Sequence, residues 1–518
     1  MIDLTVAQIA DIVGGELADI SAQAAADLHV TGTVEFDSRK VTPGGLFLAL
    51  PGARSDGHDH AASAVAAGAV AVLAARPVGA PAIVVAPGPP ATQRDGATSG
   101  GLAGVIEHDG DGSGAAVLAA LAKLAAAVAA ELVAGGLTIV GITGSSGKTS
   151  TKDLLAGVLE PLGEVVAPPG SFNNELGHPW TVLRATGSTD YLILELSARH
   201  PGNIAELAAI APPAIGVVLN VGTAHLGEFG SRETIAQTKS ELPQAIPRSG
   251  VVVLNVDDRA VAAMADVTAA RVVRVSRHSR TDAGPADVWA GPVTLDELAR
   301  PQFTLHTADN VVDIRLAVHG DHQVSNALCA AAVALECGAT CEQVATALAG
   351  AGPVSQHRMR VSTRRDGVTV IDDAYNANPD SMQAGLQALA WIARGGSGPV
   401  PRRSWAVLGE MAELGEDAIS EHDRIGRLAV RLDVSRLVVV GMGRSMSAMH
   451  HGAVMEGSWG GEAALVDDAD AALTLLRAEL QPGDVVLVKA SNAAGLGALA
   501  DSLVADTEAA DQGQGDRR

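Results

Sequence analysis

Residues 143–149, with the sequence Thr-Gly-Ser-Ser-Gly-Lys-Thr, have the composition of a phosphate-binding loop. Residues 137–142 predict a short buried strand before this loop, and residues 150–159 predict a helix after it. Backbone N–H groups of such a turn and the positive end of the helix face one anion. Lys148 would neutralise the terminal phosphates of a nucleotide, and the next threonine would offer a hydroxyl to Mg²⁺. Ile142 stands where the usual P-loop has its first glycine, so the motif is a shortened variant, with a plain turn as the weaker alternative.

Three further candidate groups follow other predicted strands. Glu195 closes the strand predicted over 191–196, where a carboxylate can hold a metal ion or merely cap a neighbouring helix. His225 comes just after the strand predicted over 215–220, at the edge where parallel sheets bind ligands, although a lone histidine is usually structural. Lys239, taken alone, is typical of a solvated lysine on a helix. Together with the phosphate-binding loop, these residue types favour hydrolysis or transfer of a nucleotide phosphate.

Several polar loops allow two interpretations. The pair Asn173-Asn174 follows a predicted strand and can line a site or simply form a turn. Residues 37–40, Asp-Ser-Arg-Lys, could bind a diphosphate, and turn formation is an equally good explanation. Residues 371–382 carry more polar side chains after a strand than a turn requires, which favours a ligand site there.

Length, composition and charge limit the class of protein. At 518 residues the chain is too long for one core, and about three domains of roughly 100–200 residues are expected. Its 36 basic and 59 acidic residues give a net charge of −23, which opposes non-specific binding to nucleic acid or anionic lipid. Aromatic residues make up 2% of the chain, so the cores must consist mainly of Val, Leu, Ile and Ala.

The cysteines and the N-terminus indicate a cytoplasmic protein. An odd, sparse set of three cysteines fits a reducing compartment. Cys337 and Cys341 lie one helical turn apart, but no further ligand has metal-site spacing, so core thiols are expected. Residues 1–17 lack the basic and apolar segments of a signal peptide. Charged residues interrupt the longest apolar run, 115–136, so we expect a packed helix and no membrane insertion.

The pattern of apolar runs predicts an α/β protein with three domains. Residues 1–112 predict a small N-terminal α/β domain. In residues 113–352, helical stretches alternate with β-branched runs, which predicts a central parallel P-loop sheet with helices on both faces. An antiparallel patch is expected within it over 288–318. Residues 353–506 predict a C-terminal Rossmann-like α/β domain, and residues 507–518 a disordered tail.

The individual elements follow from the same patterns. Thr5 is expected to cap a helix over 7–13, residues 319–349 to form helices, and residues 87–114 to form a flexible linker. The predicted strands are 45–50, 69–74, 82–85, 137–142, 164–167, 191–196, 215–220, 251–255, 271–275, 368–372, 404–408, 436–440 and 485–489.

Five motifs together resemble the Mur ligase superfamily, over nearly the whole chain. They are the phosphate-binding loop and the segments 173–179, 220–227, 372–379 and 409–415. The resemblance implies a three-domain ATP-dependent enzyme that forms an amide through an acyl phosphate. Segment 409–415 is similar to the member that adds D-alanyl-D-alanine to UDP-N-acetylmuramoyl-tripeptide in peptidoglycan precursor synthesis. A monomer with these two substrates and no nucleic-acid partner is therefore expected.

The resemblance also implies roles for individual residues. The first domain would hold the uridine nucleotide, the central domain ATP, and the third domain would close over both. Two Mg²⁺ ions are implied, and Lys239 is implied to be carbamylated, which would turn its cation into an anion. The implied catalytic residues are Lys148, Glu195, His225 and Lys239; the ATP-binding residues Gly144, Ser145, Ser146, Gly147, Lys148, Thr149, Ser150, Asn326, Arg358, Asp373 and Asn376; the metal ligands Thr149, Glu195, His225 and Lys239; and the substrate-binding residues Ser38, Arg39, Asn173, Asn174, Tyr375, Asn378 and Lys489.

Four positions depart from the superfamily pattern. Gln323 stands where Asn is often found, and Ser197 where Gly is usual. Ala490 and Asn492 replace Gly and Arg of a common Lys-Gly-Ser-Arg motif, and Asn492 thereby removes a charge that could meet the substrate.

Two other functions remain open. One is a relative that ligates another amino acid, of the folylpolyglutamate or cyanophycin type, and the other is an inactive nucleotide-binding partner of such a ligase. Within the favoured function, the third residue of the accepted peptide can be meso-diaminopimelate or lysine.

Overall fold

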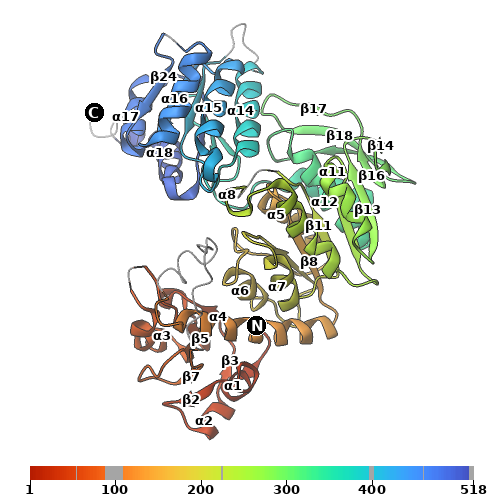
Figure 1. Cartoon of the computed structure of the whole chain (residues 1–518), viewed down its shortest axis with the longest axis vertical. Helices are drawn as coiled ribbons and strands as arrows, with labels where there is room; N and C mark the ends of the chain where they lie inside the picture. Colours follow the sequence, from red (N-terminus) through yellow and green to blue (C-terminus); the bar gives the residue numbers. More distant parts are fainter. Residues whose placement is uncertain (54, 88–108, 223–225, 396–401, 459, 513–518) are drawn as a thin grey trace.

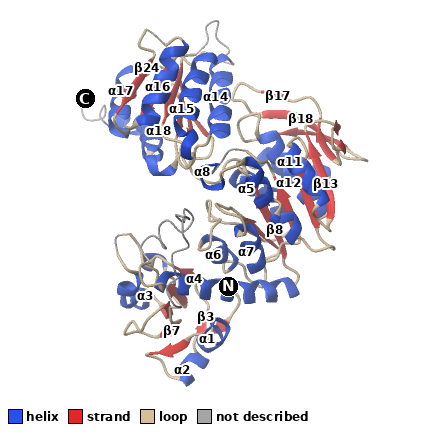
Figure 2. Cartoon of the chain, in the orientation of Figure 1, coloured by secondary structure: helices blue, strands red, loops and turns tan. Residues whose placement is uncertain are grey.

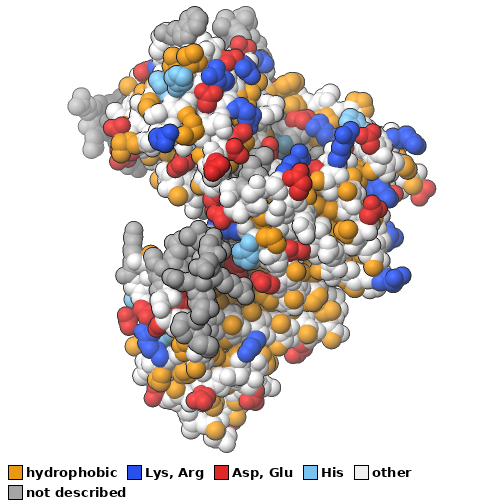
Figure 3. All heavy atoms as spheres, viewed as in Figure 1, with side chains coloured by type: hydrophobic (Ala, Val, Ile, Leu, Met, Phe, Trp, Pro, Cys, Tyr) orange, Lys and Arg blue, Asp and Glu red, His pale blue; other side chains and the backbone are white. Residues whose placement is uncertain are grey.

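Three large β-sheets, each with its own helices, follow one another along the described part of the chain (Figure 1), and two two-stranded sheets, β1-β3 and β14-β15, accompany them. The computed structural model describes residues 1–53, 55–87, 109–222, 226–395, 402–458 and 460–512. We call the parts built on the three large sheets the first, central and third units. The surface is deeply indented between the first and third units, and acidic and basic side chains are intermixed over the face in Figure 3.

The first unit is a small sheet flanked by short helices. Its strand order is β2-β7-β6-β5-β4, and all pairs are parallel except β2–β7. Thr5 caps α1 with a capping box, as the sequence predicts. The elements are β1 (Leu4–Thr5), α1 (Val6–Val13), β2 (Glu16–Ala18), α2 (Ala22–Asp27), β3 (His29–Val30), β4 (Val34–Glu35), η1 (Ser38–Lys40), β5 (Gly45–Leu48), η2 (Gly57–His60), α3 (Ala61–Ala66), β6 (Ala69–Ala74) and β7 (Ala82–Val84).

Helix α4 (Ser113–Ala134) lies between the first and central units (Figure 1). It is long and apolar enough to cross a membrane by length and composition. In the structure, however, Val117, Leu121 and Val128 are fully buried in a core that both units share. The predicted packed helix is therefore confirmed. Most of the predicted linker, residues 88–108, lies outside the described residues, and its last two positions already belong to α4.

The central unit is a ten-stranded sheet in which an internal strand, β8, leads into the phosphate-binding loop. Strand β8 (Thr138–Thr143) lies between β10 (Tyr191–Glu195) and β11 (Ile215–Val218), with parallel pairing on both sides. Helices α5, α12 and α13 pack on one face of the sheet, and α4, α7 and α10 on the other; Figure 2 shows α5 and α12 beside strand β8. The predicted antiparallel patch is present as β16 to β19.

Among the other elements of the central unit, strands β9, β12 and β13 match predicted strands closely. These other elements are α5 (Lys148–Leu159), η3 (Glu160–Leu162), β9 (Val165–Val166), α6 (Gly177–Val182), α7 (Asn203–Ile210), α8 (Leu226–Phe229), α9 (Arg232–Lys239), α10 (Glu241–Ala245), β12 (Val251–Asn255), α11 (Arg259–Ala262), η4 (Ala263–Asp266), β13 (Arg271–Ser276), β14 (Arg280–Thr281), β15 (Gly284–Pro285), β16 (Val288–Ala290), β17 (Thr294–Leu295), β18 (Pro301–His306), β19 (Val311–Arg315), α12 (Gln323–Glu336) and α13 (Cys341–Gly350).

The cysteines lie in or beside the core of this unit, as expected for structural thiols. Cys329 and Cys341 are buried and Cys337 is half-buried. Burial raises the pKa of the Cys329 thiol to about 12 and that of Cys337 to about 11, so both stay protonated.

The third unit is a six-stranded sheet of order β20-β21-β25-β22-β23-β24, parallel except for β20. Helices α14, α15 and α16 cover one face, and α17 and α18 the other. The elements are β20 (Arg360–Thr363), β21 (Thr369–Asp373), α14 (Pro379–Arg394), β22 (Ser404–Leu408), η5 (Gly415–Asp417), α15 (Ala418–Arg431), β23 (Arg436–Val440), α16 (Arg444–Glu456), β24 (Ala463–Val466), α17 (Ala469–Glu479), β25 (Val485–Lys489), η6 (Asn492–Ala494) and α18 (Leu496–Gln512).

The predicted disordered tail is wrong for its first half. Residues 507–512 continue α18, because the helix runs on from a buried apolar stretch that includes Leu499 and Leu503. Residues 513–518 lie outside the described residues.

Two contacts fix the third unit against the central unit. The indole N–H of Trp391 on α14 donates to the backbone oxygen of Asp296 at 2.8 Å. Ala299, in the same hairpin, is fully buried in the core of the third unit. In the connecting segment, the hydroxyl and amide of Ser355 bond to Asp153 on α5 at 3.1 and 3.0 Å. The connection is thus held close to the phosphate-binding loop.

Candidate active site

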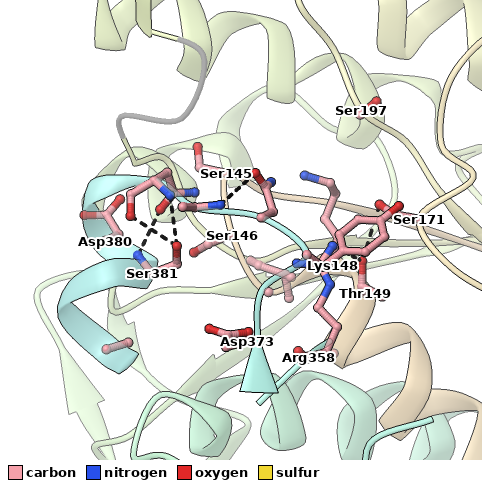
Figure 4. Close-up of a pocket in the computed structure, with 18 of the residues that line it drawn as sticks. Ser145, Ser146, Lys148, Thr149, Ser171, Ser197, Arg358, Asp373, Asp380 and Ser381 are labelled. Atoms are coloured by element: carbon pink, nitrogen blue, oxygen red, sulfur yellow. Dashed lines mark hydrogen bonds between the residues drawn. The ribbon is translucent and has the colours of Figure 1, made fainter. Parts of the chain in front are cut away.

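A cavity of about 810 Å³ lies between the carboxyl edge of the central sheet and the third unit. The phosphate-binding loop and the loops after β9, β10 and β11 form its central side, and residues 358–359, 373–381 and 489–493 form the opposite side. Figure 4 shows Lys148 and Thr149 beside Arg358, with Asp373 contributed by the third unit. The fold therefore brings residues from far apart in the sequence to one site.

The phosphate-binding loop is held open by Asn220, at the end of β11. Its side-chain oxygen accepts hydrogen bonds from the backbone N–H groups of Ser145 and Ser146, both at 3.0 Å. Gly147 has φ +85°, and a Cβ there would come within 2.6 Å of the Asn326 side-chain oxygen. Glycine is thus required at this position both by its backbone conformation and by its neighbour.

Helix α5 begins at Lys148, two residues before the predicted start, because Gly147 forms the turn directly before it. The Lys148 ammonium donates to the backbone oxygen of Gly144 at 2.6 Å. Burial lowers the pKa of Lys148, and the nearby Glu195 carboxylate opposes this shift. A cation at the start of a helix, facing a cavity, is suited to binding phosphate.

Glu195 presents a buried carboxylate with one oxygen open. Its side chain is 0% exposed, and Oε2 accepts from the hydroxyl of Thr149 at 3.2 Å, from Ser171 at 3.4 Å and from the amide of Asn173 at 3.4 Å. Oε1 has no hydrogen-bond partner among the described residues. A buried carboxylate oxygen without a partner is costly unless a cation binds it. The group and its hydroxyl neighbour therefore fit a Mg²⁺ site.

Lys239 is not the solvated helix lysine that its position alone suggests. It ends α9 and is 6% exposed. Burial lowers its pKa well below the usual value, and the charge of Lys148 lowers it further. Its ammonium nitrogen makes no hydrogen bond within the described part of the chain. His225, the other predicted metal ligand, lies outside the described residues.

The third unit contributes a fixed network of charges. The ammonium of Lys489, 1% exposed, donates to Asp373 at 2.5 Å and to the backbone oxygen of Asn376 at 2.9 Å. The guanidinium of Arg358 stacks on Tyr375 at 4.3 Å and donates to the Thr149 hydroxyl at 3.4 Å. The structure thus uses Lys489 to hold the loop after β21, and Arg358 to connect that loop to the phosphate-binding loop.

The predicted asparagines divide into two groups. Asn173, Asn326, Asn376 and Asn378 line the cavity, whereas Asn174 does not. The Asn378 side chain accepts from Ser381 N at 2.9 Å and caps α14, so it also has a structural role.

The predicted nucleotide-binding residues of the first unit do not reach the cavity. Ser38 and Arg39 lie in η1, and neither lines it. Arg39 is exposed and bonds to Asp37 at 2.8 and 2.9 Å, which helps lower the pKa of that carboxyl to about 2. The sequence prediction of a separate site in the first unit is compatible with this position.

Sequence reasoning assigned no role to several residues that shape the cavity. Ser171 donates to Glu195, and Asn220 supports the phosphate-binding loop. Of the two, only Asn220 lies in a motif that could be recognised in the sequence. Arg199 and Glu413 form an ion pair across the cavity wall. His357, with φ +55°, bonds to Asp372 at 2.8 Å just before Arg358.

His422 on α15 fixes the loop that carries Glu413. It is fully buried, its Nε2 accepts from the backbone N–H of Met411 at 2.9 Å, and its Nδ1 lies 2.5 Å from the backbone oxygen of Ala418. These contacts assign a neutral ring with its proton on Nδ1. Burial lowers the pKa of His422, opposed by the Ala418 oxygen and by the charges of Glu410 and Glu421.

We expect this loop to loosen in acid. Since the pKa of His422 is lowered on folding, its contribution to stability is complete above the unfolded value of 6.5 and is lost as pH falls below it. Protonation of Nε2 also removes the acceptor of the Met411 N–H. Hydrogen exchange at Met411, corrected for the intrinsic effect of pH, should therefore lose protection below that pH. In H422Q this pH dependence should disappear, whereas in H451Q, at an exposed histidine, it should remain; protection that does not change with pH in the parent protein would contradict the assignment.

Comparisons with known proteins agree with the site. Residues 31–91 match the family described as "Mur ligase family, catalytic domain", residues 142–334 the "Mur ligase middle domain", and residues 357–492 the "Mur ligase, glutamate ligase domain". The protein named UDP-N-acetylmuramoyl-tripeptide--D-alanyl-D-alanine ligase from Mycobacterium leprae is 77% identical over 98% of this chain and 99% of its own length.

Solved structures give the same result. MurF from Acinetobacter baumannii superposes with a TM-score of 0.77 at 28% identity, covering 97% of this chain and 99% of that one. MurF ligase from Thermotoga maritima, in complex with ADP, superposes with a TM-score of 0.70 at 27% identity, covering 92% of this chain and 98% of that one. From these matches and the α/β architecture described above, the chain belongs to the Mur ligase family, among its MurF members.

Proposed function

We propose that this protein is an ATP-dependent amide ligase that joins D-alanyl-D-alanine to UDP-N-acetylmuramoyl-tripeptide. The products would be UDP-N-acetylmuramoyl-pentapeptide, ADP and phosphate, in peptidoglycan precursor synthesis. The observation that carries the proposal is the cavity in which Lys148 and Thr149 face the third unit, with the buried Glu195 carboxylate directly behind Thr149. The name of the Mycobacterium leprae relative, 77% identical, supports the choice of substrates.

ATP would bind along the phosphate-binding loop. The ADP complex of the Thermotoga maritima relative supports this use of the fold. Residues 144–150 would surround the phosphates, with Asn326 behind Gly147. Arg358, Asp373 and Asn376 would meet the nucleotide from the third unit.

The chemistry follows from the reactants. A carboxylate and an amine do not condense in neutral water, so the peptide carboxylate must first accept the terminal phosphoryl group of ATP. The dipeptide amine then attacks the acyl phosphate, and phosphate leaves from the tetrahedral intermediate. Lys148 lowers the repulsion between the two anions in the first step. Closure of the third unit over the cavity would exclude water, which would hydrolyse the acyl phosphate, and would hold the reactants in register, worth about 7–11 kcal/mol.

Mg²⁺ would be held by Thr149, Glu195, His225 and Lys239, as two ions. The open oxygen of buried Glu195 supports this assignment. When bound, Mg²⁺ would neutralise charge on the transferring phosphoryl group.

Lys239 would take part as a carbamate. Because burial and Lys148 both disfavour its cation, the neutral amine is available to attack CO₂. The nitrogen forms a bond to carbon and loses its proton, and the product is an anion. The reaction therefore converts the neutral amine of Lys239 into an anion that is attracted by Lys148 and offers an oxygen ligand to a metal ion.

We expect K239A to lose activity by about two orders of magnitude, because a metal ligand is worth several kcal/mol. Acetate or propionate should partly restore its turnover, since a short carboxylate can occupy the space of the carbamate. The rescue is measured as kcat against carboxylate concentration, and ¹³CO₂-labelled parent protein should give a carbamate signal by NMR. K123A, a lysine on α4 outside the cavity, is the control and should show no rescue. Full activity of K239A without any added carboxylate would overturn the carbamate.

The remaining assignments are part of the same proposal. Ser38 and Arg39 would hold the uridine diphosphate in a domain of residues 1–112, followed by an ATP-binding domain of residues 113–352 and a third domain of residues 353–506. The tripeptide would extend from the first domain toward Asn173, Asn174, Tyr375, Asn378 and Lys489. We place the enzyme in the cytoplasm as a monomer.

A product assay tests the function directly. The protein is incubated with ATP, Mg²⁺, UDP-N-acetylmuramoyl-tripeptide and D-alanyl-D-alanine, and the pentapeptide is detected by mass. Tripeptides with meso-diaminopimelate or lysine determine the third residue, and a panel of single amino acids tests for another acceptor. Formation of the pentapeptide is expected, and its absence with both tripeptides would overturn the proposal.

A further inference from the structure

An ion pair between the central and third units lies in the cavity wall. Arg199 follows β10, and its guanidinium lies 2.8 Å from the carboxylate of Glu413 in the loop after β22. The two side chains are 27% and 31% exposed, so the pair is neither buried nor fully solvated. Both residues line the cavity. An ion pair that borders a cavity can exchange its partner for a charged ligand.

The position of Glu413 is fixed by its own loop. Its backbone has φ +64°, which is uncommon for a residue with a side chain. The two preceding N–H groups are held by His422 and by the hydroxyl of Ser491, both at 2.9 Å. The loop therefore holds Glu413 at the cavity wall opposite Arg199, in a backbone conformation that costs free energy.

The other cations of the cavity have different partners. Lys148 lies at the phosphate-binding loop, and Arg358 stacks on Tyr375 beside Thr149. Lys489 is almost completely buried and paired with Asp373. Among the described arginines and lysines that line the cavity, Arg199 is the one whose partner is a half-exposed carboxylate on another unit.

The acceptor substrate needs such a cation. D-Alanyl-D-alanine carries a terminal carboxylate that stays charged while its amine reacts. Asn492, which lines the cavity, stands where the superfamily resemblance gives an arginine, so this loop offers no cation there. Arg199 lies in the loop after β10, four residues beyond Glu195, and lines the same cavity as Lys148 of the phosphate-binding loop. Arg199 therefore borders the cavity in which the phosphoryl group would be transferred.

We propose that Arg199 binds the carboxylate of the incoming dipeptide, and that Glu413 holds the guanidinium in place until the dipeptide displaces it. The inference rests on the proposed ligase function and adds the residues that select a dipeptide with a free carboxylate. A guanidinium–carboxylate pair gives two parallel hydrogen bonds and so also orients the dipeptide.

The test compares D-alanyl-D-alanine with D-alanyl-D-alaninamide, which lacks the carboxylate charge. In the parent enzyme, KM for the amide should exceed KM for the dipeptide by about 10- to 100-fold, the value of a hydrogen bond to a charged group. R199A should raise KM for the dipeptide by a similar factor and remove the difference between the two acceptors. KM for ATP should change much less than KM for the dipeptide, because the ion pair of Arg199 is with Glu413 and not with a proposed ATP-binding residue.

Two further variants separate this role from simple loss of structure. E413Q removes the competing carboxylate and should lower KM for the dipeptide. R259A, in an exposed ion pair with Asp282 outside the cavity, should leave both KM values unchanged. If R199A keeps the discrimination of the parent enzyme between dipeptide and amide, the proposal is wrong. Absence of product from the parent enzyme with either acceptor would instead count against the ligase function itself.

Discussion

Replacement of Lys148 by methionine is expected to lower kcat for pentapeptide formation by about 10³-fold, the upper value for removal of one preorganised charge donor. Lys148 begins α5 at the base of the cavity, where the helix terminus and the loop amides already favour an anion. Methionine keeps the length and apolar stem of lysine, so the loop should fold normally. The loss would therefore report the missing charge during phosphoryl transfer. The measurement is the rate of ADP release at saturating substrates, together with the Kd of ADP.

The two readouts have different expected responses. ADP affinity should fall less than kcat, because the charge on the transferring group is greatest in the transition state. K123M, at an exposed lysine of α4 outside the cavity, serves as the matched control and should keep the parental rate. A K148M enzyme with near-parental kcat would show that Lys148 does not stabilise the transferring phosphoryl group.

Strands that are buried on both sides could be predicted from the sequence almost to the residue. β12, β22, β23 and β25 have exactly the predicted bounds, since parallel strands covered by helices are continuous apolar runs. Edge strands are harder to predict. β20 pairs on one side, has exposed ends and contains no continuous apolar run. β24, at the other edge, is a run of four apolar residues that is only partly buried, and so short a run does not distinguish a strand from a helix.

The same distinction applies to the site. The phosphate-binding loop is local, because strand, turn and helix are adjacent in the sequence, and its position could be predicted. The burial of Lys239 could not, since α9 carries few apolar residues and its local sequence gives no sign that its last residue is buried. The pair Arg199–Glu413 likewise depends on how the third unit packs against the central one.

Replacement of Glu195 by glutamine is expected to abolish the response of the protein to Mg²⁺ and to lower kcat by about 10³-fold, several kcal/mol of metal stabilisation. Glutamine has the shape of glutamate and can still accept from Thr149, Ser171 and Asn173, so Tm without Mg²⁺ should change little. In the parent protein, millimolar Mg²⁺ with a non-hydrolysable ATP analogue should raise Tm, because a ligand that binds only the folded state stabilises it. In E195Q, the rise in Tm should be only the part that the ATP analogue produces without Mg²⁺.

The thermal readout tests the metal assignment without reference to turnover. Oε1 of Glu195 is fully buried and has no hydrogen-bond partner in the described part of the chain, so a cation is the group that compensates its charge. E131Q, on the exposed side of α4, makes the same chemical change where no metal is expected and should respond to Mg²⁺ as the parent does. If E195Q gains as much Tm from Mg²⁺ as E131Q, the ion is held elsewhere. The open oxygen of Glu195 would then have to be satisfied by a substrate hydrogen bond, and the carboxylate would act in binding rather than in phosphoryl transfer.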